Sequence, residues 1–317
     1  MSADLKSVEI ALIGPQRPQV TEELERRFTV HHLYAEKDQA GWMKAHGARI
    51  RGAASHGMAG ISGAQLAGLP NLEICAINGV GLETSDVEGC RARGVKLTIT
   101  PVLYDDVADL ALGLALAACR RIVEGDRFVR SGAWLKGRFE LGRKLTGMKV
   151  GLIGLGRIGR EVAARLEGFK CRIAYVDPVA EHPSYERKPD LVTLARDVDI
   201  LFLCAAGAAK GKAAPIVGRE VFEALGPRGT FVNIARGWLV DETALVEMLQ
   251  QKKLGAAGLD VFDDEPRVPE ALLSMNNVVL TPHIASSTEE TMGQMGETVV
   301  ANLVSWFEGK GALTSVT

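Results

Sequence analysis

Cysteine is scarce in this chain of 317 residues, and its few copies are not paired in the sequence. No two of them stand in a Cys-x-x-Cys arrangement, and their number is odd. Such a set predicts reduced thiols in a cytoplasmic protein, and it argues against both a disulfide framework and a zinc site. We therefore expect no metal centre. The cysteines are Cys75, Cys90, Cys119, Cys171 and Cys204.

The chain also lacks a strong excess of charge and a long apolar run. The 37 basic and 39 acidic side chains leave a formal net charge of −2, so a basic face for nucleic acid is not expected. The first residues have no apolar core of the kind that a signal peptide needs. The longest apolar run, 107–119, is interrupted by Asp109 and is too short to cross a bilayer. We expect neither a nucleic acid nor a membrane as partner.

The first hundred residues have the pattern of a small α/β unit. Apolar strands are expected near 8–14, 74–77 and 95–98, and the polar segment 21–28 has helical character. This alternation predicts parallel strands, and Pro101 marks the end of the unit.

A helix is expected at 107–122, with Asp105 and Asp106 as candidate N-caps. The segment is apolar almost all round, so it needs cover from a second domain or another subunit. The following stretch, 130–143, is expected to be a polar loop.

From residue 149 the sequence alternates regularly between strands and helices. Such alternation predicts a doubly wound parallel sheet, the Rossmann fold. The closing helix, 288–307, has no strand after it, so we expect it to cover the first unit. The predicted architecture is a dinucleotide-binding domain, 102–287, inserted in a smaller, discontinuous, flavodoxin-like substrate-binding domain, 1–101 and 288–317. The strands of the larger domain are expected at 150–153, 171–176, 200–204, 230–234, 257–261 and 278–281.

Residues 154–159 form a Gly-x-Gly-x-x-Gly turn between a strand and a helix. The first glycine allows a tight turn, the second allows close approach of a pyrophosphate, and the third lets helix and strand pack closely. Asp177 ends the next strand, 18 residues beyond the last glycine. A carboxylate at that point accepts hydrogen bonds from an adenosine ribose, although an acid before Pro178 is also an ordinary turn residue. Together these features predict dinucleotide binding.

The charge of Asp177 favours NAD as cofactor. A carboxylate at this position repels the 2′-phosphate of NADP. Arg157 or Lys188 would offset that repulsion if either lies nearby, so NADP stays possible.

Three polar residues follow three later strands, namely Arg236, Glu265 and His283. Taken singly, the arginine is typical of a surface ion pair, the glutamate of a solvated loop and the histidine of a turn. Because the carboxyl ends of parallel strands border the ligand crevice, we expect the three to converge. A fixed cation, a proton donor and an acid that tunes the donor are what reduction of a keto acid requires.

With these motifs, the sequence resembles the D-isomer-specific 2-hydroxyacid dehydrogenase family, and most of all its glyoxylate/hydroxypyruvate and hydroxyphenylpyruvate reductase branch. The similarity extends from about residue 50 to the C-terminus and is poorer before that. The segments that carry it are 105–110, 150–159, 233–237, 258–266 and 281–286.

The resemblance implies a role for each site residue. Arg236 would bind the substrate carboxylate and polarise its carbonyl, His283 would be the acid/base, and Glu265 would hold and charge His283. The amides of Val80 and Gly81 would also bind the carboxylate, although a plain glycine turn is the alternative. The implied cofactor-binding residues are Gly154, Gly156, Arg157, Ile158, Gly159, Asp177, Ala235 and Asp260, the last for the nicotinamide carboxamide.

The resemblance further implies a homodimer joined through the cofactor domains, and it places the loop 56–58 across the pocket. The chain departs from the family pattern at 205–211, a loop that we expect on the adenine side. Residues 79–81 supply no aromatic platform for a large side chain.

The expected function is NAD(P)H-dependent reduction of a small 2-keto acid, glyoxylate or hydroxypyruvate, to the D-2-hydroxy acid. One alternative is another branch of the family: a D-lactate, phosphoglycerate or hydroxyphenylpyruvate dehydrogenase. A second is a dinucleotide-sensing interaction protein, which would not need Arg236, Glu265 and His283 together.

Overall fold

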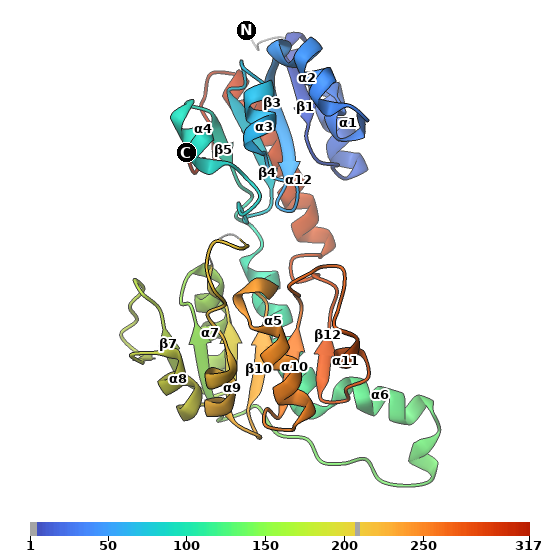
Figure 1. Ribbon diagram of the computed structural model, residues 1–317, viewed down its shortest axis with the longest axis vertical. Coiled ribbons are helices and arrows are strands. Elements are labelled where there is room, and N and C mark those ends of the chain that lie inside the picture. The colour runs from blue at the N-terminus through green and yellow to red at the C-terminus, as the bar shows by residue number, and fades with distance from the viewer. Residues whose placement is uncertain (1–4, 207–209) are drawn as a thin grey trace. The chain divides into compact units, whose positions relative to one another are not determined.

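The computed structural model describes residues 5–206 and 210–317, which divide into two compact units (Figure 1). The first unit contains the chain up to Leu103 together with Thr288–Thr317, and the second is Tyr104–Ser287. Within the described ranges, no helix is both long and apolar enough to span a membrane.

The first unit is built on a parallel sheet of five strands in the order β2-β1-β3-β4-β5, counted over the described residues. That order is the flavodoxin-like arrangement. The strands are β1 (Glu9–Leu12), β2 (Thr29–His31), β3 (Ile50–His56), β4 (Ile74–Asn78) and β5 (Lys96–Thr98). The helices are α1 (Pro18–Arg27), α2 (Gln39–His46), α3 (Gly63–Gly68), α4 (Val87–Ala92) and α12 (Glu289–Phe307).

Both faces of this sheet are covered, because alternate residues of a strand point to opposite sides. Ile10 and Leu12 of β1 pack in one core with Val299 and Leu303 of α12. Ala11 belongs to the opposite core, which α2, α3 and α4 help to form. The last helix of the chain thus closes the sheet that the first strands build (Figure 1).

The second unit contains a parallel sheet of seven strands in the order β12-β11-β10-β9-β6-β7-β8, again over the described residues. The order reverses between β6 and β9, where open α/β sheets bind their ligands. The strands are β6 (Lys149–Ile153), β7 (Arg172–Val176), β8 (Glu186–Arg187), β9 (Ile200–Leu203), β10 (Thr230–Asn233), β11 (Ala256–Leu259) and β12 (Val278–Leu280). The helices are α5 (Tyr104–Arg120), α6 (Ile122–Arg130), α7 (Arg157–Gly168), α8 (Leu191–Asp197), α9 (Arg219–Leu225), α10 (Glu242–Gln250) and α11 (Glu270–Leu273). The predicted Rossmann sheet, with a second and smaller α/β sheet, is confirmed.

The expected start of the helix at 107 is wrong. Helix α5 begins at Tyr104, so Asp105 and Asp106 lie in its first turn and do not cap it. Asp105 and Asp109 bind Arg165 of α7, with N–O distances of 2.7 and 2.5 Å. An ion-pair network therefore occupies one side of a helix that we expected to be apolar almost all round.

The expected end of that helix is also wrong, whereas the loop expected at 130–143 is largely confirmed. Helix α5 stops at Arg120 because Arg121 adopts a left-handed conformation, with φ of 54°. A separate helix, α6, follows, and a short 3₁₀ turn at Ala133–Leu135 lies within the segment expected as a loop. Helix α6 extends away from the sheet of its own unit (Figure 1).

Candidate active site

The glycine-rich turn joins β6 to α7, and each of its glycines has a distinct environment. Gly154 has a φ of +93°, and a Cβ there would lie 2.7 Å from Cα of Ala205. A Cβ on Gly159 would lie 2.2 Å from the carbonyl oxygen of Gly154. The first and third glycines are thus required by the protein's own packing. A Cβ on Gly156 would meet no atom of the described chain, so packing does not explain this glycine, and close approach of a ligand would.

Asp177 follows β7 and faces this turn. Its carboxylate accepts hydrogen bonds from the backbone N–H of Leu155 at 2.7 Å, Val179 at 2.9 Å and Ala180 at 2.6 Å. Burial acts to raise its pKa, but these N–H groups and the charge of Arg187 together hold the pKa of Asp177 below its usual value. Asp177 is therefore an ionised acceptor at neutral pH, tied directly to the glycine-rich turn.

The cation beside Asp177 is Arg187 of β8, which the sequence analysis did not identify. Its guanidinium donates to the carbonyl oxygen of Asp177 at 2.8 Å. The two cations considered from the sequence have other partners. Arg157, at the start of α7 before Ile158, donates to the hydroxyl of Tyr104 at 2.5 Å. Lys188 pairs with Glu186 and Asp197.

Arg236 lies in the turn after β10, which Asn233 holds. The buried Asn233 side chain accepts from the N–H of Ala235 at 3.0 Å and donates to the carbonyl oxygen of Arg236 at 3.1 Å. The guanidinium donates to the carbonyl oxygen of Ala235 at 2.7 Å and lies 5.9 Å from the centre of the Trp238 ring. Sequence reasoning missed both Asn233 and Trp238 as supports of this arginine.

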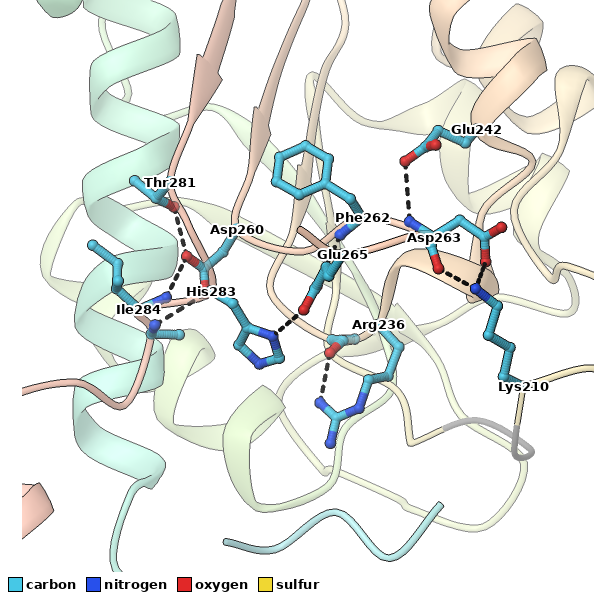
Figure 2. Close-up of polar contacts among 12 residues, drawn as sticks. Lys210, Arg236, Glu242, Asp260, Phe262, Asp263, Glu265, Thr281, His283 and Ile284 are labelled. Carbon is cyan, nitrogen blue, oxygen red and sulfur yellow. Dashed lines mark hydrogen bonds and ion pairs between the residues drawn. The ribbon is translucent and has the colours of Figure 1, made fainter. Parts of the chain in front are cut away.

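Glu265 and His283 form a hydrogen-bonded pair (Figure 2). Glu265 Oε2 lies 2.7 Å from Nδ1 of His283, and Glu265 Oε1 accepts from the N–H of Phe262 at 3.0 Å. Burial acts to raise the pKa of Glu265, but His283, the Phe262 N–H and the charge of Arg236 outweigh it and hold the pKa low. The loops after β10, β11 and β12 thus bring an arginine, a carboxylate and a histidine together at one edge of the sheet.

His283 has a left-handed backbone conformation, with φ of 53°, which is rare for a residue with a side chain. Such a conformation costs on the order of 1–3 kcal/mol and persists only where the surroundings enforce it. The fully buried Asp260 supplies that enforcement. Its side chain accepts from the Thr281 hydroxyl at 2.6 Å and from the N–H of Ile284 and Ala285 at 2.9 Å, and its carbonyl oxygen accepts from the N–H of His283 at 2.8 Å. Asp260 therefore holds the turn that presents His283.

Val80 and Gly81 belong to the first unit, at the carboxyl edge of its own sheet. They follow β4 by way of Gly79, which has a φ of +139° and donates to the Thr100 hydroxyl at 2.8 Å. No acceptor among the described residues is found for the N–H of Val80 or Gly81. The neighbouring loop at Gly57 is joined to this edge, because Gly57 N–H donates to the carbonyl oxygen of Asn78 at 3.1 Å.

His56 ends β3 on the same edge of the first unit. It is half-buried, and burial lowers the pKa of its imidazole. The uncharged form of His56 is therefore favoured at neutral pH. The Met58 side chain, two residues on, is largely exposed.

The loop at 205–211 lies partly outside the described residues, since 207–209 are not described. Its last part contacts the loop after β11. Lys210 binds the side chain of Asp263, in the loop after β11, at 3.1 Å and also donates to the carbonyl oxygen of Asp263. In strand order, β11 lies on the opposite side of β6 from Asp177, which follows β7 and would mark the adenine side.

Comparison with known proteins agrees with this geometry. The model of the D-isomer specific 2-hydroxyacid dehydrogenase, NAD binding domain, matches residues 112–285. Glyoxylate/hydroxypyruvate reductase A of Arabidopsis thaliana is 41% identical over 98% of this chain and 100% of its own length. Hydroxyphenylpyruvate reductase of Plectranthus scutellarioides is 42% identical over the same shares. The chain belongs to the D-isomer specific 2-hydroxyacid dehydrogenase family.

A solved structure of this family supports the same assignment. The NADPH-dependent glyoxylate/hydroxypyruvate reductase from Sinorhizobium meliloti, in complex with NADP and malonate, superposes with a TM-score of 0.89. It is 39% identical, and the match covers 98% of this chain and 97% of that one. As a 2-hydroxyacid dehydrogenase, the protein is an NAD(P)-dependent oxidoreductase, as the sequence predicted.

Proposed function

We propose that this 2-hydroxyacid dehydrogenase reduces hydroxypyruvate to D-glycerate, or glyoxylate to the achiral glycolate, with a nicotinamide cofactor. The observation that carries the proposal is the 2.7 Å pair of Glu265 and His283, with Arg236 close enough to lower the pKa of Glu265. Relatives named as glyoxylate/hydroxypyruvate reductases, about two-fifths identical over nearly the whole chain, support the substrate class.

Each residue of the site has a defined part in this reaction. When bound, the nicotinamide cofactor supplies the hydride. Because Glu265 accepts from Nδ1 of His283, Nε2 is the nitrogen left to pass a proton to the keto oxygen. Arg236 presents a planar pair of donors to the substrate carboxylate, and the amides of Val80 and Gly81 add two more. Proton transfer from a positioned acid contributes about 10²–10⁴-fold to the rate.

The glycine-rich turn fits a pyrophosphate. Gly156 is the N-cap of α7 and leaves open space beside the first turn, where backbone N–H groups and the helix dipole favour an anion. Ile158 and Gly159 belong to that first turn, and we assign them, together with Gly154, Arg157 and Ala235, to cofactor binding. We also assign Asp260 to the nicotinamide carboxamide. Its carboxylate is fully buried and has protein donors on both oxygens, so this contact requires the side chain to become accessible when the cofactor binds.

Initial rates of NADH oxidation with a panel of keto acids test the proposed substrate. We expect the highest kcat/KM with hydroxypyruvate or glyoxylate and lower values with bulky aromatic keto acids. A maximum with hydroxyphenylpyruvate would assign the protein to the aromatic branch. NADH binding with no turnover of any keto acid would favour the sensing protein considered above.

For the cofactor we propose a preference for NAD over NADP, supported by the ionised carboxylate of Asp177. Arg187 works against this preference, because its guanidinium lies beside Asp177 and would attract a 2′-phosphate. Asp177→Ser should therefore narrow the ratio of kcat/KM for NADH to that for NADPH, and Arg187→Ala should widen it. Each change is expected to move the ratio about 10-fold, since one charge-assisted hydrogen bond is worth about 1.5–3 kcal/mol.

Steady-state kinetics with both cofactors measures these ratios. Arg196→Ala, on the exposed side of α8, is the matched control and should leave the ratio unchanged. A wild-type preference for NADPH, or movement of the two variants in the same direction, would contradict the assignment.

We further propose a homodimer formed through the second unit. Helix α6 and the segment after it have no buried core residue of their own and expose large apolar side chains. Patches of this kind mark protein–protein interfaces. The exposed side chains include Ile122, Val129, Trp134, Leu135 and Leu141. A monomer at micromolar concentration in sedimentation velocity would contradict the proposal.

A cytoplasmic location, proposed from the five free cysteines, is tested by cell fractionation.

A further inference from the structure

The peptide between Phe262 and Asp263 touches the backbone that carries Arg236. A Cβ added to Gly237 would lie 1.8 Å from the carbonyl carbon of Phe262, 2.0 Å from its oxygen and 2.3 Å from the nitrogen of Asp263. The residue that follows Arg236 must therefore be glycine for these two loops to meet. Any movement of the Phe262–Asp263 peptide acts directly on the turn that carries Arg236.

Two carboxylates hold the two successive peptide groups that meet at the Cα of Phe262: Glu265 binds the N–H of the first, and Glu242 binds the N–H of the second, the Phe262–Asp263 peptide. The N–H of Phe262 donates to Oε1 of Glu265 at 3.0 Å, and the next N–H, of Asp263, donates to Oε1 of Glu242 at 3.1 Å (Figure 2). The first of these bonds orients the carboxylate whose other oxygen meets His283. Among the described residues Glu242 has no hydrogen bond to His283, and its hydrogen bond to the Asp263 N–H is what links it to the site.

The environment of Glu242 is unusual for an acidic side chain. It is the first residue of α10, half-buried, and the groups near it are Asp263, Asp264 and Lys210. Burial raises the pKa of Glu242; the two aspartates act in the same direction, while the Asp263 N–H and Lys210 oppose them. A carboxylate in such surroundings is costly unless it gains a directed hydrogen bond, and the Asp263 N–H provides one.

We propose that Glu242 is a positioning residue for the reaction. By holding the Asp263 N–H, it fixes the Phe262–Asp263 peptide, and through that peptide it keeps Glu265 aimed at His283 and the Arg236 turn in place. The inference rests on the proposed function, because the positioned groups are those assigned to keto-acid reduction.

The test compares three substitutions of Glu242 with one control. Glu242→Ala removes the acceptor, Glu242→Asp draws it back by one methylene, and Glu242→Gln keeps an acceptor oxygen without the charge. Glu247→Ala is the control, since Glu247 is on the same helix and pairs with Arg219 at the surface. The measurements are kcat/KM for hydroxypyruvate against pH, the NADH dissociation constant, and the midpoint of thermal unfolding.

Glu242→Ala and Glu242→Asp should lower kcat/KM by about 10- to 100-fold, the loss expected for a misplacement below about 1 Å. They should also move the alkaline limb of the reduction profile to lower pH, because a displaced Glu265 stabilises the protonated imidazole less. Glu242→Gln should recover most of the loss, and Glu247→Ala should match the wild type. NADH affinity should stay within about threefold throughout, below 1 kcal/mol of binding free energy.

A lower unfolding midpoint with an unmoved pH profile would overturn the proposal, because it would leave Glu242 a purely structural role. Equal losses of kcat/KM in Glu242→Gln and Glu242→Ala would also overturn it, because the effect would then depend on the negative charge of Glu242 and not on its hydrogen bond. If Glu242→Ala does not fold, Glu242→Asp still tests the proposal. NMR titration of the His283 ring, assigned with His283→Gln, gives a readout that needs no turnover. A shift there in a protein that reduced no keto acid would refute the proposed function and support the positioning role.

Discussion

Arg236→Lys should lower kcat/KM for keto-acid reduction by about 100-fold, because lysine keeps the charge but loses the planar fork that matches a carboxylate. The change should leave the NADH dissociation constant within about threefold, a difference below 1 kcal/mol. The reason is its position in the turn after β10, where its charge acts on Glu265 of the Glu265–His283 pair. Fluorescence titration with NADH, set beside steady-state kinetics, separates the two effects.

Arg219→Lys is the matched control for this experiment. Arg219 lies in the same unit and pairs with Glu247 at the surface, so a lysine there should change neither quantity. Equal losses of NADH affinity and of kcat/KM in Arg236→Lys would give Arg236 a structural role. Its hydrogen bond to Ala235 and its position over Trp238 make such a role the natural alternative.

Glu265→Gln should move the alkaline limb of the keto-acid reduction profile to lower pH. Because the pKa of Glu265 is lowered, this carboxylate stays ionised throughout the neutral range and the limb reports His283. Reduction needs a protonated His283, and the substitution removes the negative charge that accepts from its Nδ1 at 2.7 Å. The proton is then lost at a lower pH, and activity falls with it.

The pH profile of the reverse reaction should move in the same direction. Oxidation of the hydroxy acid needs an uncharged His283, so its rising limb should also move to lower pH in Glu265→Gln. Each unit of movement corresponds to about 1.4 kcal/mol of coupling between the two side chains. Glu270→Gln, an exposed acid on α11, should leave both limbs in place. Limbs that stay fixed in Glu265→Gln, or move to higher pH, would show that Glu265 does not tune His283.

The sheet of the second unit was predictable because its strands are buried on both faces and appear as apolar runs. Strand, glycine turn and helix follow one another at 149–168, and Asp177 ends the next strand. The ends of long helices were less predictable. The break between α5 and α6 depends on the left-handed conformation of Arg121, and an arginine carries no signal for a positive φ.

The residues that hold the side chains of the site in position could not be predicted from the sequence for a similar reason. Nothing marks His283 as left-handed, since glycine or asparagine is the usual residue there. Asp260 was expected to serve the cofactor, and only the fold reveals that its buried carboxylate holds the turn on both sides of His283. Arg187 reaches Asp177 from β8, a two-residue strand too short to leave a pattern. These contacts join residues that are 10 to 25 positions apart, and spacing alone does not identify such pairs.

Reaction with hydroxypyruvate and NADH, followed by chiral chromatography of the product, tests the proposed function most directly. We predict NADH oxidation matched mole for mole by D-glycerate, and kcat/KM for both about 100-fold lower in Arg236→Lys while NADH still binds. Formation of L-glycerate would contradict the assigned stereochemistry. Binding of NADH without oxidation by hydroxypyruvate, glyoxylate or phenylpyruvate would contradict catalysis by His283 and Arg236 altogether.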